Sequence, residues 1–517
     1  MPRPTLILGT LTPDASSDVP LYKQLYDGLR AAILDGRIAP GAQLPSTRSL
    51  GRELGIGRNT VIAAYEQLTA EGYLSPHIGA GTIVADIPPD TLLEVKEPLG
   101  DLKPATSAPT PILSARGQVL AGIERNAARY NGLKARAFQH GLPAVDEFPR
   151  AVWSRLLGER AKSLRASFYD YELSAGLPEL QTAIAAYVGA ARGVIASPEQ
   201  VIVTTGAQSA LDLAARMLID PGDRVWHEEP GYLGARGAFL GGGAEIIPIP
   251  VDESGMKVEE AIASAPVPRL IYVTPSHQYP LGCTLTLTRR LALIDYARRE
   301  SAWIIEDDYD SEYRYTGRPI AAMQGLDRSG SVIYMGTFAK TLFPALRIGY
   351  LIVPQKLVKA FGTALRLTGQ TPATLHQAAL ADFMTQGHFG AHVRRMRALY
   401  AERRACLIDA IQNHLGDWLE PIPGEGGLQL ATKLAPDLED RLVSLTGRDE
   451  QIITTPLSNY CLEKPRYSGL HMGFAAVPMG DIERAAKRLG ALVSNQRTSL
   501  KQTPPTPEHV GKLKVSP

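Results

Sequence analysis

The chain has 517 residues, of which 44% are hydrophobic and 21% are charged. This composition excludes a fibrous repeat and a wholly disordered chain, and the length is sufficient for at least two hydrophobic cores. The 54 Lys and Arg residues nearly balance the 53 Asp and Glu residues. Any binding of nucleic acid must therefore depend on locally placed charge rather than on a strongly basic chain.

Cys283, Cys406 and Cys461 are far apart and show no paired spacing. This pattern argues against a disulfide framework and against a zinc site, so we expect no metal and a reducing, cytoplasmic compartment. The apolar run at residues 5–11 is too short for the core of a signal peptide, and no later window is long enough to span a membrane. We expect neither export nor membrane insertion.

Residues 19–85 have the pattern of three helices followed by a small hairpin, and residues 1–18 before them are expected to be flexible. Apolar residues recur every four positions from Leu21 to Ile33, which predicts a buried stripe on a first helix. Ser46 is a good N-cap for a second, short helix. A glycine-containing turn then leads to a third helix, and this order is typical of a helix-turn-helix. The predicted inner face of the third helix is Val61, Ile62, Tyr65 and Leu68.

The hairpin that follows is predicted to be a wing, with strands at residues 73–74 and 82–84 and a turn at residues 75–81. Basic and amide side chains occupy the positions where a winged helix contacts phosphates, base edges and the minor groove. The alternative is a small helical domain for protein interaction with solvated arginines. The predicted DNA-contacting residues are Arg48, Arg52, Arg58, Asn59, Thr60 and His77.

Residues 86–115 are rich in Pro and Thr without sustained periodicity, which predicts a linker. Beyond it, apolar strand-like runs alternate with helical segments, the pattern of a mostly parallel α/β sheet. Ligands bind such sheets at the carboxyl ends of the strands. Residues 496–517 are polar and contain Pro, and we expect a disordered tail there.

A strand-like run at residues 331–335 leads into a loop that ends in Lys340, with Arg347 seven residues further on. The lysine amine could form a Schiff base with an aldehyde cofactor, and the arginine could hold a cofactor phosphate. Asp307 and Tyr309 follow another apolar strand, with both side chains on one side. They could bind a protonated pyridine nitrogen and a ring hydroxyl, as in a pyridoxal-phosphate site. The alternative is an ordinary acidic loop at a strand end.

Three further strand-end loops contain candidate residues for binding the cofactor or its ligand. Free amides at the helix start near Ala207 and Gln208 would hold phosphate, Tyr232 would stack on the cofactor ring, and His277 would reach the cofactor or ligand. Each also has a commoner explanation: a plain strand-to-helix turn, a packed tyrosine, and a structural histidine. The glycines at residues 241–243 are interpreted as a turn before a strand.

Taken together and in this order along the chain, these strand-end loops resemble those of the fold-type I aminotransferases. Together with the N-terminal module, the chain is similar to the MocR-type regulators of the GntR superfamily, which include the GABA-responsive regulator. The resemblance covers residues 19–492 and is most specific at residues 274–282, 305–312, 336–340 and 346–350.

The resemblance implies an α/β architecture: a winged helix-turn-helix at residues 19–85, and a fold-type I transferase with a large domain and a small C-terminal α/β subdomain at residues 116–495. It also implies pyridoxal 5'-phosphate as cofactor. The residue that carries the internal aldimine would be Lys340, and those that bind the pyridine nitrogen, ring hydroxyl and phosphate would be Asp307, Tyr309, Thr337 and Arg347.

One position departs from the aminotransferase pattern. Many of these enzymes place an arginine for the substrate carboxylate just before the apolar run of the last strand, where this chain has His471. A histidine cannot form the same bidentate, permanently charged clamp. This argues against efficient transamination of an ordinary amino acid. Arg236 is the candidate for supplying the missing charge.

We therefore expect a cytoplasmic homodimeric regulator that binds paired operator half-sites, and is nucleoid-associated when it does so. It would sense an amine-bearing small molecule through an external aldimine. A second hypothesis is a working aminotransferase with an appended DNA-binding module. A third is a DNA-binding protein whose large domain is only a scaffold without cofactor, but the full set of partners around Lys340 argues against it.

Overall fold

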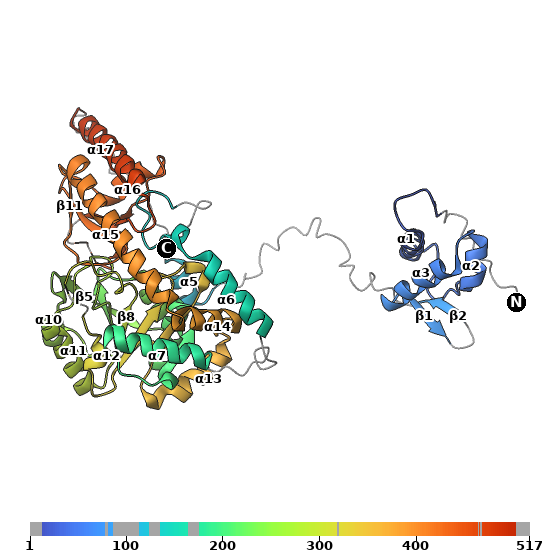
Figure 1. The fold of residues 1–517 in the computed structure, drawn as a ribbon, viewed down its shortest axis with the longest axis horizontal. Helices are drawn as coiled ribbons and strands as arrows, with labels where there is room; N and C mark the ends of the chain where they lie inside the picture. Colours follow the sequence, from blue (N-terminus) through green and yellow to red (C-terminus); the bar gives the residue numbers. More distant parts are fainter. Residues whose placement is uncertain are drawn as a thin grey trace, which may run out of the picture. The chain divides into compact units, whose positions relative to one another are not determined.

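The computed structural model describes residues 13–77, 81–85, 113–123, 135–163, 175–317, 320–463, 465 and 468–502. The chain divides into two units, Met1–Pro111 and Ile112–Pro517, and each is described by itself (Figure 1). Most of the predicted linker, and the tail beyond residue 502, lie outside the described residues. Across the described ranges, no helix is long and apolar enough to cross a membrane.

The smaller unit has the predicted order of elements. Its described helices and strands are α1 (Leu21–Leu34), α2 (Thr47–Glu53), α3 (Arg58–Ala70), β1 (Leu74–His77) and β2 (Gly81–Val84). The Ser46 hydroxyl accepts a hydrogen bond from the Ser49 N–H at 3.2 Å, which confirms the predicted N-cap of α2. Such a cap contributes about 1 kcal/mol to stability. The Tyr65 hydroxyl donates to the Pro45 carbonyl at 3.0 Å, so α3 is tied to the turn before α2.

The apolar stripe of α1 forms the core of this unit as predicted. Leu25, Leu29 and Ile33 are buried, whereas Leu21 at the start of the helix is only half-buried. Burial of each large aliphatic side chain stabilises the fold by roughly 1.5–3 kcal/mol. On α3, Ala64 belongs to the inner face and Ile62 is only partly covered, because a period of 3.6 residues places positions 61, 64, 65 and 68 together.

The predicted wing is present, but its turn is shorter than expected. β1 extends to His77 and pairs antiparallel with β2, from Leu74 opposite Val84 to His77 opposite Gly81. Residues 75–77 are therefore strand rather than turn, because the antiparallel register continues to Gly81. Residues 78–80, which join the strands, lie outside the described part of the chain.

The larger unit is built on the predicted α/β sheet of mostly parallel strands. The strand order is β3-β10-β9-β8-β7-β4-β5-β6. The pairs from β9 through β5 are parallel, and β10 and β6 are antiparallel to their neighbours. Helices cover both faces, which explains why the central strands β7, β8 and β9 each begin with a run of apolar residues. The strands are β3 (Val201–Thr204), β4 (Arg224–Glu229), β5 (Glu245–Asp252), β6 (Gly255–Met256), β7 (Leu270–Val273), β8 (Trp303–Asp308), β9 (Val332–Thr337) and β10 (Gly349–Ile352).

Helices α5 to α14 accompany this sheet, and Figure 1 shows α7, α10, α11, α12 and α13 around it. The glycine run at residues 241–243 is not a loop: α9 continues through Gly242, and Gly243 ends it with φ 91°. Gly243 donates its N–H to carbonyls of the last turn, the usual way a glycine terminates a helix. The helices are α5 (Ala115–Ala121), α6 (Arg150–Ser163), α7 (Pro178–Arg192), α8 (Ala207–Leu218), α9 (Leu233–Gly242), α10 (Val258–Ser264), α11 (Leu287–Glu300), α12 (Met323–Leu326), α13 (Val358–Thr368) and α14 (Thr374–Thr385).

A small subdomain follows, with an antiparallel sheet in the order β11-β12-β14-β13. Figure 1 shows its helices, in orange and red, at one end of the larger unit. The helix α17 continues to Gln502, so the predicted disordered tail begins inside a helix. The elements are α15 (His388–His414), β11 (Leu419–Pro421), β12 (Gln429–Leu434), α16 (Asp440–Arg448), β13 (Thr455–Pro456), β14 (Gly469–Gly473) and α17 (Met479–Gln502).

Candidate functional site

The register of three neighbouring strands brings three sequence motifs to one edge of the large sheet. Thr337, the last residue of β9, lies opposite Gly349, the first residue of β10. Gly349 in turn lies opposite Thr204, the last residue of β3. Arg347 comes two residues before Gly349, and Ala207 opens α8 three residues after Thr204. The residues predicted to hold a phosphate therefore lie on adjacent loops.

The turn between β3 and α8 requires glycine. Gly206 has φ 88° and ψ 173°, a conformation essentially restricted to glycine. A Cβ on Gly349 would lie 3.0 Å from the Ala207 nitrogen, so the two loops approach closely. In the part of the chain that the structure describes, no side chain caps α8. The amides of Ala207 and Gln208 in its first turn are consequently available to an anion.

Arg347 adopts a left-handed backbone conformation with φ 53°, which costs a non-glycine residue on the order of 1 kcal/mol. Its side chain is exposed, and among the described residues it has no ion pair or hydrogen bond. The Thr337 hydroxyl accepts from the Ala339 N–H at 3.2 Å and keeps its own proton for another acceptor. The amides at the start of α8, the Thr337 hydroxyl and the Arg347 guanidinium can therefore all donate hydrogen bonds at this edge of the sheet, which suits a phosphate group.

Asp307 is buried within β8, so the alternative of a solvated acidic loop is wrong for this residue. One carboxylate oxygen accepts a hydrogen bond from the Tyr272 hydroxyl at 2.6 Å. The other, Oδ1, is buried and has no partner within the described residues. Burial raises the pKa of Asp307 to about 7, although the hydrogen bond from Tyr272 acts in the opposite direction. A protonated pyridine nitrogen supplies both the charge and the donor that this oxygen lacks.

Lys340 follows β9 by three residues and is half-buried. Its amine donates to the Gly141 carbonyl at 2.7 Å. Loss of hydration lowers the pKa of Lys340, while the carboxylates of Asp310 and Asp307 oppose the change. A lysine with a lowered pKa is more often neutral at neutral pH, which is the form that attacks an aldehyde.

Tyr309 and His277 are brought together. The Tyr309 hydroxyl lies 2.9 Å from Nδ1 of His277, and that nitrogen lies 3.0 Å from Oδ1 of Asp310. All three side chains are buried. Because the carboxylate is the stronger acceptor, the imidazole N–H donates to Asp310. The Tyr309 hydroxyl then keeps its proton for an acceptor such as a phenolate oxygen.

Tyr232 and Gln208 also lie together. The Tyr232 ring lies against Gly234, where a Cβ would come within 2.5 Å of the ring, and it meets the Tyr279 ring edge-on at 5.4 Å. Gln208 donates its side-chain N–H to the Gly234 carbonyl at 2.9 Å. Arg236, one turn further along α9, is half-buried, and burial lowers its pKa.

His471 lies on β14 and is fully buried. Its ring centroid is 4.6 Å from that of His140, and its Nδ1 is 3.0 Å from the Tyr460 hydroxyl. Burial lowers the pKa of His471 well below its usual range. A neutral imidazole cannot replace the charge of an arginine. Arg236 is the other candidate for that charge; burial lowers its pKa, and the nearby Glu229 and Cys461 act in the opposite direction.

Several residues of this site were missed at the sequence level. The phenol of Tyr272 was visible as one polar group within an apolar strand, and His140 and Gly141 as part of a short polar stretch between Phe138 and Leu142. Neither signal identifies a partner, because each contact joins distant parts of the chain. The residues missed are His140, Gly141, Tyr272, Tyr279, Asp310 and Tyr460.

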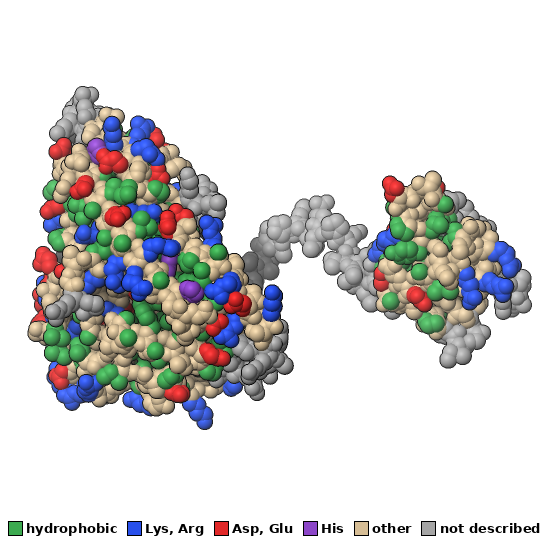
Figure 2. Space-filling model, viewed as in Figure 1, with side chains coloured by type: hydrophobic (Ala, Val, Ile, Leu, Met, Phe, Trp, Pro, Cys, Tyr) green, Lys and Arg blue, Asp and Glu red, His purple; other side chains and the backbone are tan. Residues whose placement is uncertain are grey.

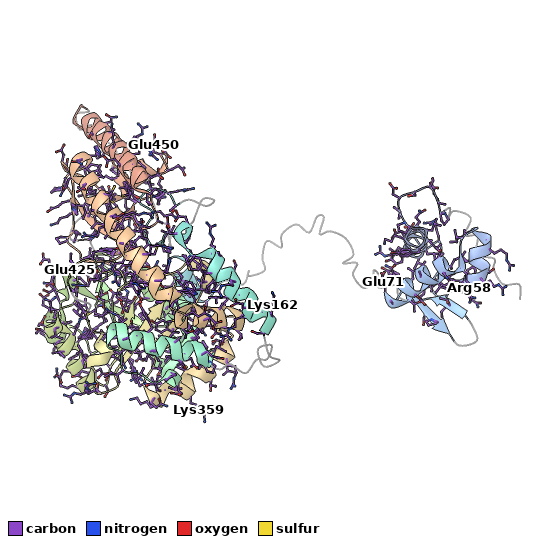
Figure 3. All side chains as sticks on the ribbon, viewed as in Figure 1. Arg58, Glu71, Lys162, Lys359, Glu425 and Glu450 are labelled. Atoms are coloured by element: carbon purple, nitrogen blue, oxygen red, sulfur yellow. The ribbon has the colours of Figure 1, made fainter. Side chains whose placement is uncertain are left out.

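Most of the predicted DNA-contacting side chains are exposed on the smaller unit. Those of Arg48, Arg52, Arg58 and Asn59 are exposed, and that of Thr60 is half-buried. Across the described residues, none of the three guanidinium groups has an ion pair. Figure 2 shows blue side chains on the side of this unit where Figure 3 labels Arg58. His77 ends β1, but its side chain lies outside the described part.

Comparison with known proteins agrees with both halves of this description. The family model "Bacterial regulatory proteins, gntR family" matches residues 21–84, and "Aminotransferase class I and II" matches residues 149–489. The probable rhizopine catabolism regulatory protein MocR of Rhizobium meliloti is 45% identical over 464 residues, which cover 90% of this chain and 92% of that protein. The chain belongs to the MocR-type regulators of the GntR family.

Other matches support the same assignment. The pyridoxine biosynthesis transcriptional regulator PdxR of Corynebacterium glutamicum is 32% identical over 473 residues, covering 90% of this chain and 94% of that protein. A crystal structure of Pyrococcus horikoshii kynurenine aminotransferase in complex with PMP has a TM-score of 0.64 and 25% identity, covering 69% of this chain and 90% of the other. This MocR-type regulator thus joins a DNA-binding winged helix to a fold-type I aminotransferase fold, and its cofactor is pyridoxal phosphate.

Proposed function

We propose that this MocR-type regulator is a cytoplasmic homodimer whose operator affinity changes when an amine-bearing small molecule binds near Lys340. The observation that carries the proposal is the buried Oδ1 of Asp307, which has no partner among the described residues and lies near a lysine of lowered pKa. Pyridoxal phosphate supplies an aldehyde carbon on which one amine can replace another. Three free cysteines are compatible with a reducing compartment.

The residues take distinct roles in this proposal. Lys340 holds the cofactor covalently, Asp307 accepts from its pyridine nitrogen, and Tyr309, oriented through His277, donates to its ring hydroxyl. Tyr232 covers the ring. Ala207, Gln208, Thr337 and Arg347 bind the phosphate, while Arg236 and His471 face the ligand.

Displacement of Lys340 by an effector amine changes local contacts. The lysine amine is hydrogen-bonded to the Gly141 carbonyl, and the adjacent His140 lies 3.1 Å from the Thr455 hydroxyl of the small subdomain. Release of the lysine therefore alters the charge beside a segment that joins the sheet to the small subdomain. An effector that binds one arrangement of these parts more tightly shifts the population toward it.

An active aminotransferase with an appended DNA-binding module is the second candidate. The lysine of lowered pKa favours it, because a released neutral lysine can move a proton as a general base. The neutral His471 counts against it, since β14 then lacks the fixed charge that would clamp a substrate carboxylate at this position.

On the DNA side, we propose that two modules of a homodimer bind paired half-sites through Arg48, Arg52, Arg58, Asn59, Thr60 and His77. Arg58 occupies the first position of α3, where the helix dipole disfavours a cation. A DNA phosphate at that position compensates for this charge. When the protein binds DNA in this way, it is nucleoid-associated.

We expect Arg58→Ala to weaken operator binding by roughly 5–150-fold, the effect of losing one good charged contact to DNA. Fluorescence anisotropy with labelled operator at several salt concentrations measures the change. Arg37→Ala is the matched control, because Arg37 is exposed on the same unit but is paired with Asp35. Equal operator affinity in wild type and Arg58→Ala would show that the assigned docking is wrong.

The second expected result concerns coupling between the two sites. If an amine changes operator affinity by a given factor, operator DNA must change the amine's affinity by the same factor. Titration of the visible spectrum with amine, in the presence and absence of operator, measures the second factor independently. Rapid steady-state transamination with no such reciprocity would favour the enzyme instead.

A further inference from the structure

Five neutral side chains form a connected polar cluster at the junction of the large sheet and the small subdomain. We call His140, Tyr279, Thr455, Tyr460 and His471 the neutral polar cluster. The Tyr460 hydroxyl lies 3.0 Å from His471 Nδ1, 3.3 Å from His140 Nε2 and 3.3 Å from the Tyr279 hydroxyl. The Thr455 hydroxyl lies 3.1 Å from His140 Nδ1. A single tyrosine hydroxyl therefore joins the other parts of the cluster.

The cluster adjoins Lys340. His140 precedes Gly141, whose carbonyl accepts the hydrogen bond from the lysine amine. The Tyr279 ring lies edge-on to that of Tyr309, with centroids 5.8 Å apart. An amine that takes the place of Lys340 would thus carry the rest of its structure toward these groups.

The cluster carries no positive charge at neutral pH. Burial lowers the pKa of His140 to about 4, and lowers that of His471 well below its usual range. The nearby charge of Lys340 acts in the same direction on both. A buried carboxylate without a cationic partner is strongly disfavoured, so the cluster does not suit an amino-acid carboxylate.

The cluster also has unused hydrogen-bonding capacity. Nε2 of His471 is buried and has no partner among the described residues, although the side chain is fully enclosed. Leaving a buried group without its hydrogen bond is unfavourable, so a ligand that supplies the missing partner gains affinity. A ligand hydroxyl can satisfy either tautomer of the ring, because it both donates and accepts. A carboxylate can only accept.

We propose that the neutral polar cluster recognises the effector, and that the effector is a primary amine bearing hydroxyl groups and no carboxylate. Tyr460 and His471 are its specificity-determining residues. The inference rests on the proposed function, since it names the class of amine that the site near Lys340 accepts.

A matched series of amines tests the proposal. The protein loaded with pyridoxal phosphate is titrated with glucamine, n-hexylamine and 6-aminohexanoate, which share one carbon-chain length and differ in hydroxyl and carboxylate groups. Half-saturation is read from the visible spectrum, and operator affinity is measured in parallel. We expect glucamine to bind at least about 10-fold more tightly than either of the others, from about two additional hydrogen bonds.

Tyr460→Phe isolates the hydroxyl that joins the cluster. We expect it to weaken glucamine binding by roughly 3–30-fold and to change n-hexylamine binding by less than about 2-fold. Tyr296→Phe is the control, because this buried tyrosine stacks on Trp226 away from the cluster. Equal weakening of both amines in Tyr460→Phe would indicate a structural effect and would overturn the assigned role.

The outcomes separate the two proposals. If 6-aminohexanoate or n-hexylamine binds as tightly as glucamine, the assignment of the effector class is wrong while amine sensing stands. A lack of response to all three amines also overturns the assignment. If a wider set of primary amines changes neither the spectrum nor operator affinity, the proposed function itself fails.

Discussion

Lys340→Ala, reconstituted with pyridoxal phosphate, will show no visible absorption beyond that of free cofactor. The Nζ atom is the only atom of residue 340 that can bond covalently to an aldehyde, and its removal leaves only non-covalent contacts with the cofactor. Borohydride reduction followed by mass spectrometry should therefore find the cofactor attached in the wild type and absent in the variant.

Lys359→Ala is the matched control, since Lys359 is an exposed lysine on α13 (Figure 3). The Lys340→Ala variant should still bind operator, because the winged helix lies in a separate unit, but its operator affinity should no longer respond to amines. Reduction of the cofactor onto another lysine in the wild type would refute the assignment of Lys340.

Asp307→Asn should stabilise the cofactor-free protein and weaken cofactor binding at the same time. Burial raises the pKa of Asp307 from 3.8 to about 7, so the charged form is disfavoured in the folded state. The folded protein loses no stability from this group below pH 3.8. The loss of stability grows as the pH rises and reaches its full size above about pH 7. A shift of about three units corresponds to about 4 kcal/mol, an upper limit for the stability gained by Asn.

The same substitution removes the anion that pairs with a protonated pyridine nitrogen. We expect the cofactor to bind roughly 10–150-fold more weakly, the usual effect of losing a hydrogen bond to a charged group. Thermal unfolding of the cofactor-free proteins at pH 5 and pH 8, together with cofactor titration, measures both effects. Asp417→Asn, at an exposed aspartate, is the control. An Asp307→Asn protein that is less stable at pH 8 than the wild type would contradict the prediction.

Local periodicity was enough to predict the winged helix and the strands of the large sheet. The stripe containing Leu25 and Leu29 repeats every four residues, and several central strands begin with apolar runs because both faces of the sheet are covered. The position of Asp307 near a strand end was likewise visible, because the apolar run at residues 303–305 gives way to acidic residues at Glu306.

The partners of these residues could not be predicted in the same way. His140 and Tyr460 meet although they lie 320 residues apart, and the phenol of Tyr272 reaches Asp307 across 35 residues. Local periodicity carries no information about such pairs, which depend on strand order and register. The glycines at residues 241–243 were misinterpreted because a glycine that ends a helix and one that forms a turn look alike in sequence.

The long helix α15 has a mechanical consequence. Its 27 residues make a rod about 40 Å long, whose first turns belong to the core beneath the large sheet and whose later turns belong to the core of the small subdomain. Near its start, Phe389 packs against Phe338, and His392 lies 3.1 Å from the Thr341 carbonyl. These two contacts flank Lys340 in sequence. A tilt of the small subdomain would therefore move α15 and, through these two contacts, the loop that carries Lys340.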